Sequence, residues 1–188
     1  MAEIHPLREQ IETCSALSDE EFAQVLGHFQ TRNFKKHQIV LAEGDRARHD
    51  YFVIKGLMRV SRTDANGREH ILQFGMENGW VTDADAFHHQ RKSTVTIDCL
   101  EPTQALSITL EGKDRLFREL PKVQTFFYHK STKDQIALQK RILCFLSGNA
   151  KERYHNLLTQ YPGLVQRVPK AMIAAYLGVT RETLSRLS

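Results

Sequence analysis

Side chains of the kinds that read DNA bases are concentrated near the C-terminal end of the chain. They follow one another closely: Thr180, Arg181, Glu182, Thr183, Ser185 and Arg186. An arginine can bind guanine through two hydrogen bonds, a glutamate can accept one from cytosine, and hydroxyl groups can reach phosphates or base edges. The residue types therefore predict a helix that enters the major groove of DNA with these side chains on its exposed faces.

Two short helices are needed to position these side chains. The apolar residues around them are spaced so that two helices can pack at a steep angle: Ile173, Ala174, Leu177, Val179, Leu184 and Leu187. Gly178 lies at the bend, which requires a residue that tolerates positive φ, and Thr180 is predicted to cap the second helix. The alternative is an ordinary helical hairpin with a polar outer face, which does not demand this arrangement of small and apolar positions.

Net charge is unevenly divided along the chain. Residues 1–120 hold 15 Lys and Arg against 19 acidic residues, and residues 121–188 hold 11 against 3. The first part thus has a formal charge of −4 and the last part +8. A basic C-terminal part is expected of a module that contacts a polyanion, although a solvated basic face has the same balance.

The predicted secondary structure before this motif changes twice, from helix to strands and then back to helix. With 188 residues the chain has room for a sensor-sized domain and a smaller second domain. Residues 2–29 have helical apolar spacing. Between residues 31 and 108 short strands alternate with turn residues, including a hairpin loop at 64–67, which predicts a sandwich, roll or barrel.

Helical spacing returns after Leu110 and predicts a short helix over 112–119 and a long one from Lys122 to about Ser147, which Pro121 opens. The two ends of the long helix carry wide apolar faces: Val123, Phe126, Phe127, Ile136, Leu138, Ile142, Leu143, Phe145 and Leu146. Faces this wide need more than one partner surface. Packing on the strands and on a second copy would provide both, and a core helix of a single domain remains the alternative.

Membrane insertion and secretion are not expected. No stretch approaches the ~18 consecutive apolar residues of a membrane span, and the N-terminal segment has acidic residues and no apolar signal region. The three cysteines, Cys14, Cys99 and Cys144, are far apart and fit no metal-binding spacing, so we interpret them as reduced structural thiols. The sequence therefore predicts a cytoplasmic protein.

The C-terminal motifs resemble those of the CRP/FNR superfamily of bacterial transcription regulators. The resemblance covers essentially the whole chain and is most specific in ERYHNLL, YPGLVQRVP and IAAYLGVTRETLSR. It implies an α+β fold with N-terminal helices and an antiparallel β-roll (1–120), a long dimerisation helix (121–148) and a helix-turn-helix domain (149–188). It also implies a homodimer on double-stranded DNA, with RNA polymerase as a candidate partner.

In this family the second helix of the motif reads DNA through an R-E-x-x-x-R pattern. The pattern falls on Arg181, Glu182 and Arg186 of this chain. The resemblance thus assigns these three residues to base contacts.

The sensor site departs from the family pattern. Members that bind cyclic nucleotide use a Gly-Glu pair, a short helix and then Arg followed by Ser or Thr, since the arginine neutralises the cyclic phosphate. In the aligned segment Thr82 replaces the Gly, Asp83 the Glu and Ser93 the Arg, and Thr94 follows. Arg91 and Lys92 are close in sequence but displaced, and a solvated loop is their simpler interpretation. We predict that cyclic AMP does not bind in the usual manner, and that the site is empty or takes another small effector.

Other cofactors and an enzymatic role find little support. An iron-sulfur cluster needs four cysteines, and no histidine lies in a context typical of haem ligands. A metal enzyme of jelly-roll type would use the histidines as ligands: His49, His70, His88 and His89. His88 and His89 are adjacent, so on a strand they would point to opposite faces. We expect no bound cofactor or metal and no enzymatic activity.

A ligand- or protein-binding regulatory module without DNA binding is the other alternative. The chain stops at Ser188, soon after the second predicted helix begins, and residues near a terminus can fray. Either this is a compact form of the DNA-binding family or the tail that follows the motif is missing, and the intact motif favours the compact form.

Overall fold

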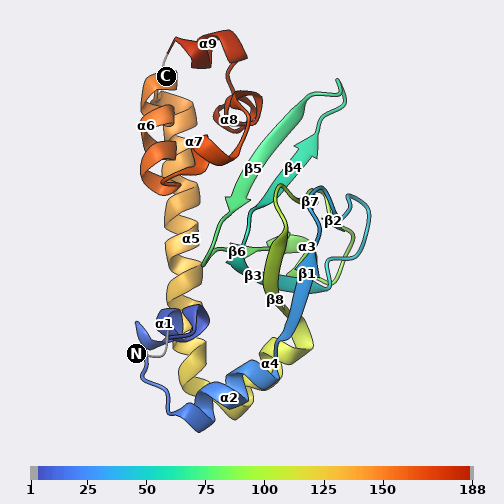
Figure 1. Ribbon diagram of the computed structural model, residues 1–188, viewed down its shortest axis with the longest axis vertical. Helices are drawn as coiled ribbons and strands as arrows, with labels where there is room; N and C mark the ends of the chain where they lie inside the picture. The colour runs from blue at the N-terminus through green and yellow to red at the C-terminus, as the bar shows by residue number, and fades with distance from the viewer. Residues whose placement is uncertain (1–3, 187–188) are drawn as a thin grey trace. The chain divides into compact units, whose positions relative to one another are not determined.

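The computed structural model describes residues 4–186 (Figure 1). Ala2, where the predicted helical segment begins, and Leu187, in the predicted second helix, lie outside the described residues. The chain divides into two compact units. The first comprises the residues up to 60 together with 74–130, and the second comprises 61–73 together with the residues from 131 onward.

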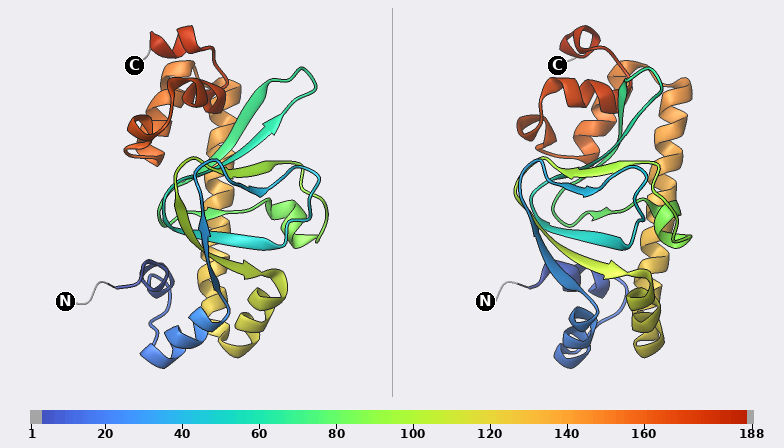
Figure 2. Two further views of the ribbon diagram at one scale, coloured as in Figure 1. Left: turned by 45° about the vertical axis from the view of Figure 1, so that its right-hand side comes forward. Right: turned by 90° about the vertical axis from the view of Figure 1, so that its right-hand side faces the viewer.

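Two four-stranded sheets form the β-roll, and Figure 2 shows them as two layers. Their orders are β1-β8-β3-β6 and β2-β7-β4-β5. The strands are β1 (Gln30–Phe34), β2 (Ile39–Leu41), β3 (His49–Lys55), β4 (Met58–Thr63), β5 (Glu69–Gly75), β6 (Trp80–Val81), β7 (Thr96–Cys99) and β8 (Thr103–Thr109). The antiparallel roll that the strand pattern predicts is confirmed, with β6 as an additional strand.

Helices precede and follow the roll, as the periodicity predicts, and one short helix, α3, lies between β6 and β7. They are α1 (Pro6–Glu12), α2 (Asp19–Gly27), α3 (Ala84–His88), α4 (Leu110–Glu119), α5 (Pro121–Ser147), α6 (Ala150–Gln160), α7 (Leu164–Arg167), α8 (Lys170–Leu177) and α9 (Arg181–Ser185). None of the helices described between residues 4 and 186 is both long and apolar enough to span a membrane.

The N-terminal helical segment consists of two helices, because a capping box at Ser18 starts the second one. The Ser18 hydroxyl accepts a hydrogen bond from the Glu21 N–H (3.2 Å), and the Ser18 N–H donates to the Glu21 carboxylate (2.8 Å). Reciprocal bonds of this kind satisfy donors that a helix start leaves unpaired. They separate α2 from α1.

An aromatic cluster holds the first turns of α5 in the first unit. The Trp80 ring centroid lies 5.2 Å from that of Phe52 on β3 and 5.2 Å from that of Phe127 on α5. Phe126 is also buried and lies 6.5 Å from Trp80. Buried aromatic pairs of this kind add to the stability that their apolar burial provides.

A buried ion pair lies beside this cluster. Asp50 on β3 is only 4% exposed, and its Oδ2 accepts a hydrogen bond from the Lys113 ammonium on α4 at 3.1 Å. The second oxygen, Oδ1, is buried without a hydrogen-bond partner in the part of the chain that the structure describes. Lys113 Nζ also lies 4.2 Å from the Phe127 ring centroid. Lys113 therefore holds α4 to β3 and to the first part of α5.

The C-terminal part of α5 differs from its first turns in burial. Val123 is fully buried, whereas six apolar side chains farther along are exposed: Ile136, Leu138, Ile142, Leu143, Phe145 and Leu146. We call these six the α5 apolar face. The following helix, α6, begins after Gly148 and Asn149, and the Asn149 side chain accepts a hydrogen bond from the Glu152 N–H at 3.0 Å.

We expect Lys113→Met to lower the free energy of unfolding by about 3 kcal/mol, because it leaves the Asp50 carboxylate buried without a partner charge. Urea unfolding followed by circular dichroism measures the change. The double variant Asp50→Asn/Lys113→Met removes both charges and is expected to recover most of the loss. A single variant as stable as the natural chain would contradict this role of the ion pair.

Candidate functional site

The C-terminal motif forms the two helices that its spacing predicts. Gly178 ends α8 with φ of 66° and ψ of 32°, the left-handed conformation that favours glycine. A Cβ atom at this position would lie only 3.0 Å from Cε1 of Phe145. Both the backbone angle and this close approach therefore require a glycine at the bend.

The start of α9 is capped as predicted. The Thr180 hydroxyl accepts a hydrogen bond from the Thr183 N–H at 3.2 Å, and the two hydroxyl oxygens lie 3.1 Å apart. Leu184 is 1% exposed and anchors the helix in the second unit. The cap and this apolar anchor fix which faces of α9 point outward.

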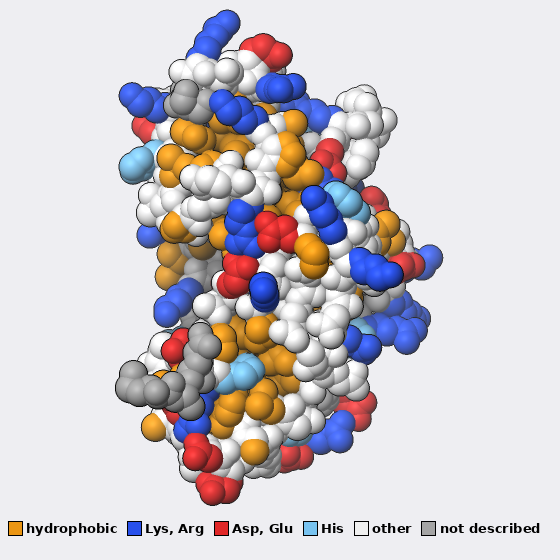
Figure 3. All heavy atoms as spheres, in the orientation of Figure 1, with side chains coloured by type: hydrophobic (Ala, Val, Ile, Leu, Met, Phe, Trp, Pro, Cys, Tyr) orange, Lys and Arg blue, Asp and Glu red, His pale blue; other side chains and the backbone are white. Residues whose placement is uncertain are grey.

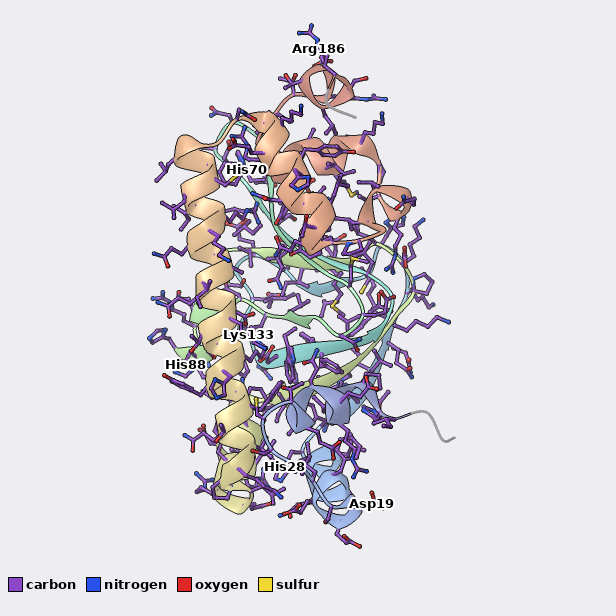
Figure 4. The ribbon with its side chains drawn as sticks, turned by 90° about the vertical axis from the view of Figure 1, so that its left-hand side faces the viewer. Asp19, His28, His70, His88, Lys133 and Arg186 are labelled. Carbon is purple, nitrogen blue, oxygen red and sulfur yellow. The ribbon has the colours of Figure 1, made fainter. Side chains whose placement is uncertain are left out.

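The side chains predicted to contact DNA lie mainly on the outer faces of α9. Arg181, Glu182, Ser185 and Arg186 are exposed, Thr183 is half-buried, and Arg186 extends away from the helices in Figure 4. Within residues 4–186, neither arginine forms a salt bridge. Both guanidinium groups therefore remain available to an external acceptor.

Glu182 is held in its ionised form. Its own backbone N–H and the Thr180 hydroxyl bond to its carboxylate and lower its pKa, and the charge of Arg181 acts in the same direction. A carboxylate at neutral pH accepts hydrogen bonds only. The residue is thus suited to a donor such as the amino group of cytosine.

At the predicted sensor site, two of the substituted positions bond to each other. Asp83 caps α3 through its Oδ1, which accepts from the Ala86 N–H at 3.1 Å. Its Oδ2 accepts from the hydroxyl of Ser93, at 2.8 Å, and from the N–H of Thr94, at 3.1 Å. The structure thus brings Asp83, Ser93 and Thr94 together around a carboxylate.

The other predicted residues of this site bond elsewhere. Arg91 is paired with Asp85 on α3, and its guanidinium lowers the pKa of that carboxyl group. Lys92 is exposed, and its backbone forms an isolated bridge with Arg46. The Thr82 hydroxyl donates to the His49 carbonyl at 2.9 Å. Asp85, which sequence reasoning missed, is therefore the residue that determines where Arg91 points.

Apolar side chains pack between the sheets next to this site. Phe87, on α3, is 4% exposed and belongs to the same core cluster as Tyr51 and Met58. Ser93 is itself 3% exposed, and its hydroxyl oxygen accepts a hydrogen bond from the Val95 N–H at 3.1 Å. The position of the family's arginine is thus occupied by a buried neutral group.

The histidines weighed as metal ligands do not converge. His88 and His89 are exposed at the end of α3, and the closest partner of His89 is Asp85. His70 pairs with Asp64 in the β4–β5 hairpin at 2.8 Å. Over the described residues, no group of three or more His, Cys, Asp or Glu is placed to hold a metal ion.

The fold defines a class of protein in which a β-roll is followed by a long helix and a helix-turn-helix. The cyclic nucleotide-binding domain family matches residues 31–119. The chain is 27% identical over 183 residues to the regulatory protein HlyX of Actinobacillus pleuropneumoniae, covering 91% of this chain and 75% of that protein. It is 25% identical over 175 residues to the cyclic AMP receptor protein of Thermus thermophilus, covering 91% and 81%.

A solved structure shows the same fold. FixK2 of Bradyrhizobium japonicum matches with a TM-score of 0.72 and 17% identity, covering 85% of this chain and 82% of that one. Together these findings support the CRP/FNR family, a family of transcription regulators and not of enzymes. They agree with the family that the C-terminal motifs predict.

Proposed function

We propose that the chain is a dimeric DNA-binding transcription regulator in which α9 contacts bases in the major groove. The observation that carries the proposal is the pair of exposed arginines, Arg181 and Arg186, on a capped helix that Leu184 anchors. Relatives that include HlyX support the same role. Such a regulator would act in the cytoplasm, where it meets DNA, and RNA polymerase stays a predicted partner.

Charge around α9 favours binding to the phosphate backbone. In Figure 3, Lys and Arg side chains surround apolar ones over the C-terminal helices. Of the residues from 121 onward, 11 are Lys or Arg and 3 are acidic. Contacts from these cations would give affinity without sequence preference, while Arg181, Glu182 and Arg186 would give specificity.

We expect Arg181→Ala and Arg186→Ala each to weaken specific DNA binding about tenfold, because each removes a bidentate contact to a base. Fluorescence anisotropy against pooled fragments of the source genome, at two salt concentrations, measures the affinity. Arg118→Ala on α4 makes the same charge change at an exposed position outside the motif and is expected to have no effect. A chain that binds no fragment would instead support the regulatory module without DNA binding.

A second copy of the chain is proposed to cover the α5 apolar face. Ile142 and Leu146 are 58% and 79% exposed, and they lie one turn apart on α5. Burying such residues against a partner is favourable at roughly 25 cal/mol per Å². A dimer joined here would place its two α9 helices on half-sites about 34 Å apart, and a change in the β-roll that shifted α5 would alter that spacing.

We expect Ile142→Glu to convert the dimer into a monomer, because it places a charge in the proposed interface. Analytical ultracentrifugation distinguishes one 21.7-kDa chain from two. Lys133→Glu is the control, since it changes an exposed charged position on the same helix. A natural chain that sediments as a monomer at micromolar concentration would contradict the proposed dimer.

The sensor site is proposed not to bind cyclic AMP in the usual manner. Where the family pattern has the arginine that neutralises the phosphate, this chain has the neutral Ser93, and the Asp83 carboxylate bonded to it would repel a cyclic phosphate. The division into a sensor part (1–120), a dimerisation helix (121–148) and a DNA-binding part (149–188) stays a prediction.

We expect isothermal titration with cyclic AMP to show no saturable binding below about 1 mM, a very weak affinity for a specific ligand. DNA binding measured with and without the nucleotide is expected to be equal, because a ligand shifts an equilibrium only through different affinities for its two states. DNA binding that appears only with cyclic AMP would show that Asp83 and Ser93 do not prevent nucleotide binding.

A further inference from the structure

A cavity of about 390 Å³ lies within the second unit, among α5, α6 and α8. Its volume is in the range of sites that hold small molecules. None of the residues predicted to contact DNA, Thr180 to Arg186, lines it. The cavity is also separate in sequence from the sensor site, whose residues belong to the first unit.

Three cationic side chains line this cavity, and none of the acidic residues between 4 and 186 does. They are Lys140 and Arg141 on α5 and Arg153 on α6. Arg153 donates to the carbonyl oxygens of Leu177 and Gly148, each at 3.0 Å. Arg153 therefore has backbone hydrogen-bond partners, and it forms no salt bridge with a carboxylate in the described part of the chain.

Arg141 is held in the same way. It donates to the carbonyl oxygens of Tyr176 (3.1 Å) and Ile71 (3.0 Å), and also to that of Leu72. The end of a helix carries about half a negative charge, so the carbonyls at the end of α8 offset only part of the charge of the two arginines. Half-buried cations without counter-ions favour an anion as occupant.

Two aromatic side chains, Phe145 and Tyr176, also line the cavity. The guanidinium carbon of Arg141 lies 3.8 Å from the Tyr176 ring centroid and 5.5 Å from the Phe145 ring centroid. The guanidinium carbon of Arg153 lies 5.2 Å from the Phe145 ring centroid. Cations stacked on rings in this way form a surface that is both apolar and positive. A flat ring can pack on such a surface while an attached acid group is attracted to the cations.

We propose that this cavity binds a small organic anion with a flat aromatic body, such as an aromatic carboxylate or sulfonate. The ligand would contact α5, α6 and α8 together, next to Gly178, where α8 ends. The proposal that an anion binds in this cavity does not rest on the proposed DNA-binding function. Each of the two proposals can therefore fail while the other holds.

The test compares two probes of almost the same shape on the full chain, anilinonaphthalene sulfonate and the uncharged N-phenylnaphthylamine. Fluorescence titration is expected to show the sulfonate binding about tenfold more tightly, because only it carries the anion. Equal affinities for the two probes would overturn the proposal, since a purely apolar surface does not distinguish them.

Variants then locate the bound sulfonate. Lys140→Glu reverses the charge of an exposed lining residue, and we expect it to weaken sulfonate binding about fivefold. Lys133→Glu is the matched control, because it makes the same change two helical turns, about 10 Å, away on α5. Equal effects of the two variants would indicate attraction to net charge alone and would overturn the proposed site.

Leu146→Ser distinguishes the cavity from the α5 apolar face, which also attracts aromatic probes. Leu146 is the most exposed residue of that face and does not line the cavity. We expect the sulfonate affinity to be unchanged in this variant. Loss of binding in Leu146→Ser together with full binding in Lys140→Glu would assign the probe to the apolar face and reject the cavity as an anion site.

Discussion

The packing of Trp80 against the first turns of α5 is the contact on which much of the arrangement depends. Phe126 and Phe127 are buried there, and Lys113 adds a cation above the Phe127 ring. An unbroken helix that is anchored at its first turns cannot bury its later apolar residues in the same core. The α5 apolar face is therefore exposed as a direct consequence of helix continuity, and burying it requires another surface.

The two predicted functional regions differ in the charge that they present. At the sensor site the Asp83 carboxylate is retained by Ser93 and Thr94, and Arg91 is neutralised by Asp85. Within residues 4–186, the arginines on α9 and around the cavity instead have no carboxylate partner. The predicted sensor site thus pairs its charges internally, whereas the arginines of the C-terminal unit do not.

Local signals in the sequence predict the helix boundaries well. Ser18, Asn149 and Thr180 are capping residues whose side chains bond within three positions, and Gly178 has the positive φ that its place at a bend requires. Short elements escaped prediction because they have too few residues to show a period. Two-residue β6 depends on pairing with β3, and four-residue α7 follows the turn at Gly163.

Contacts between residues far apart in the sequence determine the features of the fold and of the sensor site that the sequence does not predict. The sequence shows that Ser93 replaces an arginine, but only the fold shows that its hydroxyl bonds to Asp83, ten positions away. The order of strands, in which β8 lies between β1 and β3, likewise depends on packing of both sheets rather than on any local pattern. Tertiary packing selects such pairings, which periodicity cannot distinguish.

Arg141 shows how such distant contacts determine the position of the helical pair. The last carbonyl groups of a helix have no partner within it, and in α8 those of Tyr176 and Leu177 accept hydrogen bonds from Arg141 and Arg153. Arg141 also bonds to carbonyls of β5, so the β4–β5 hairpin, α5 and α8 share one guanidinium. Since Gly178 and α9 follow directly from this end of α8, the orientation of α9 depends on two arginines that lie outside the predicted DNA contacts.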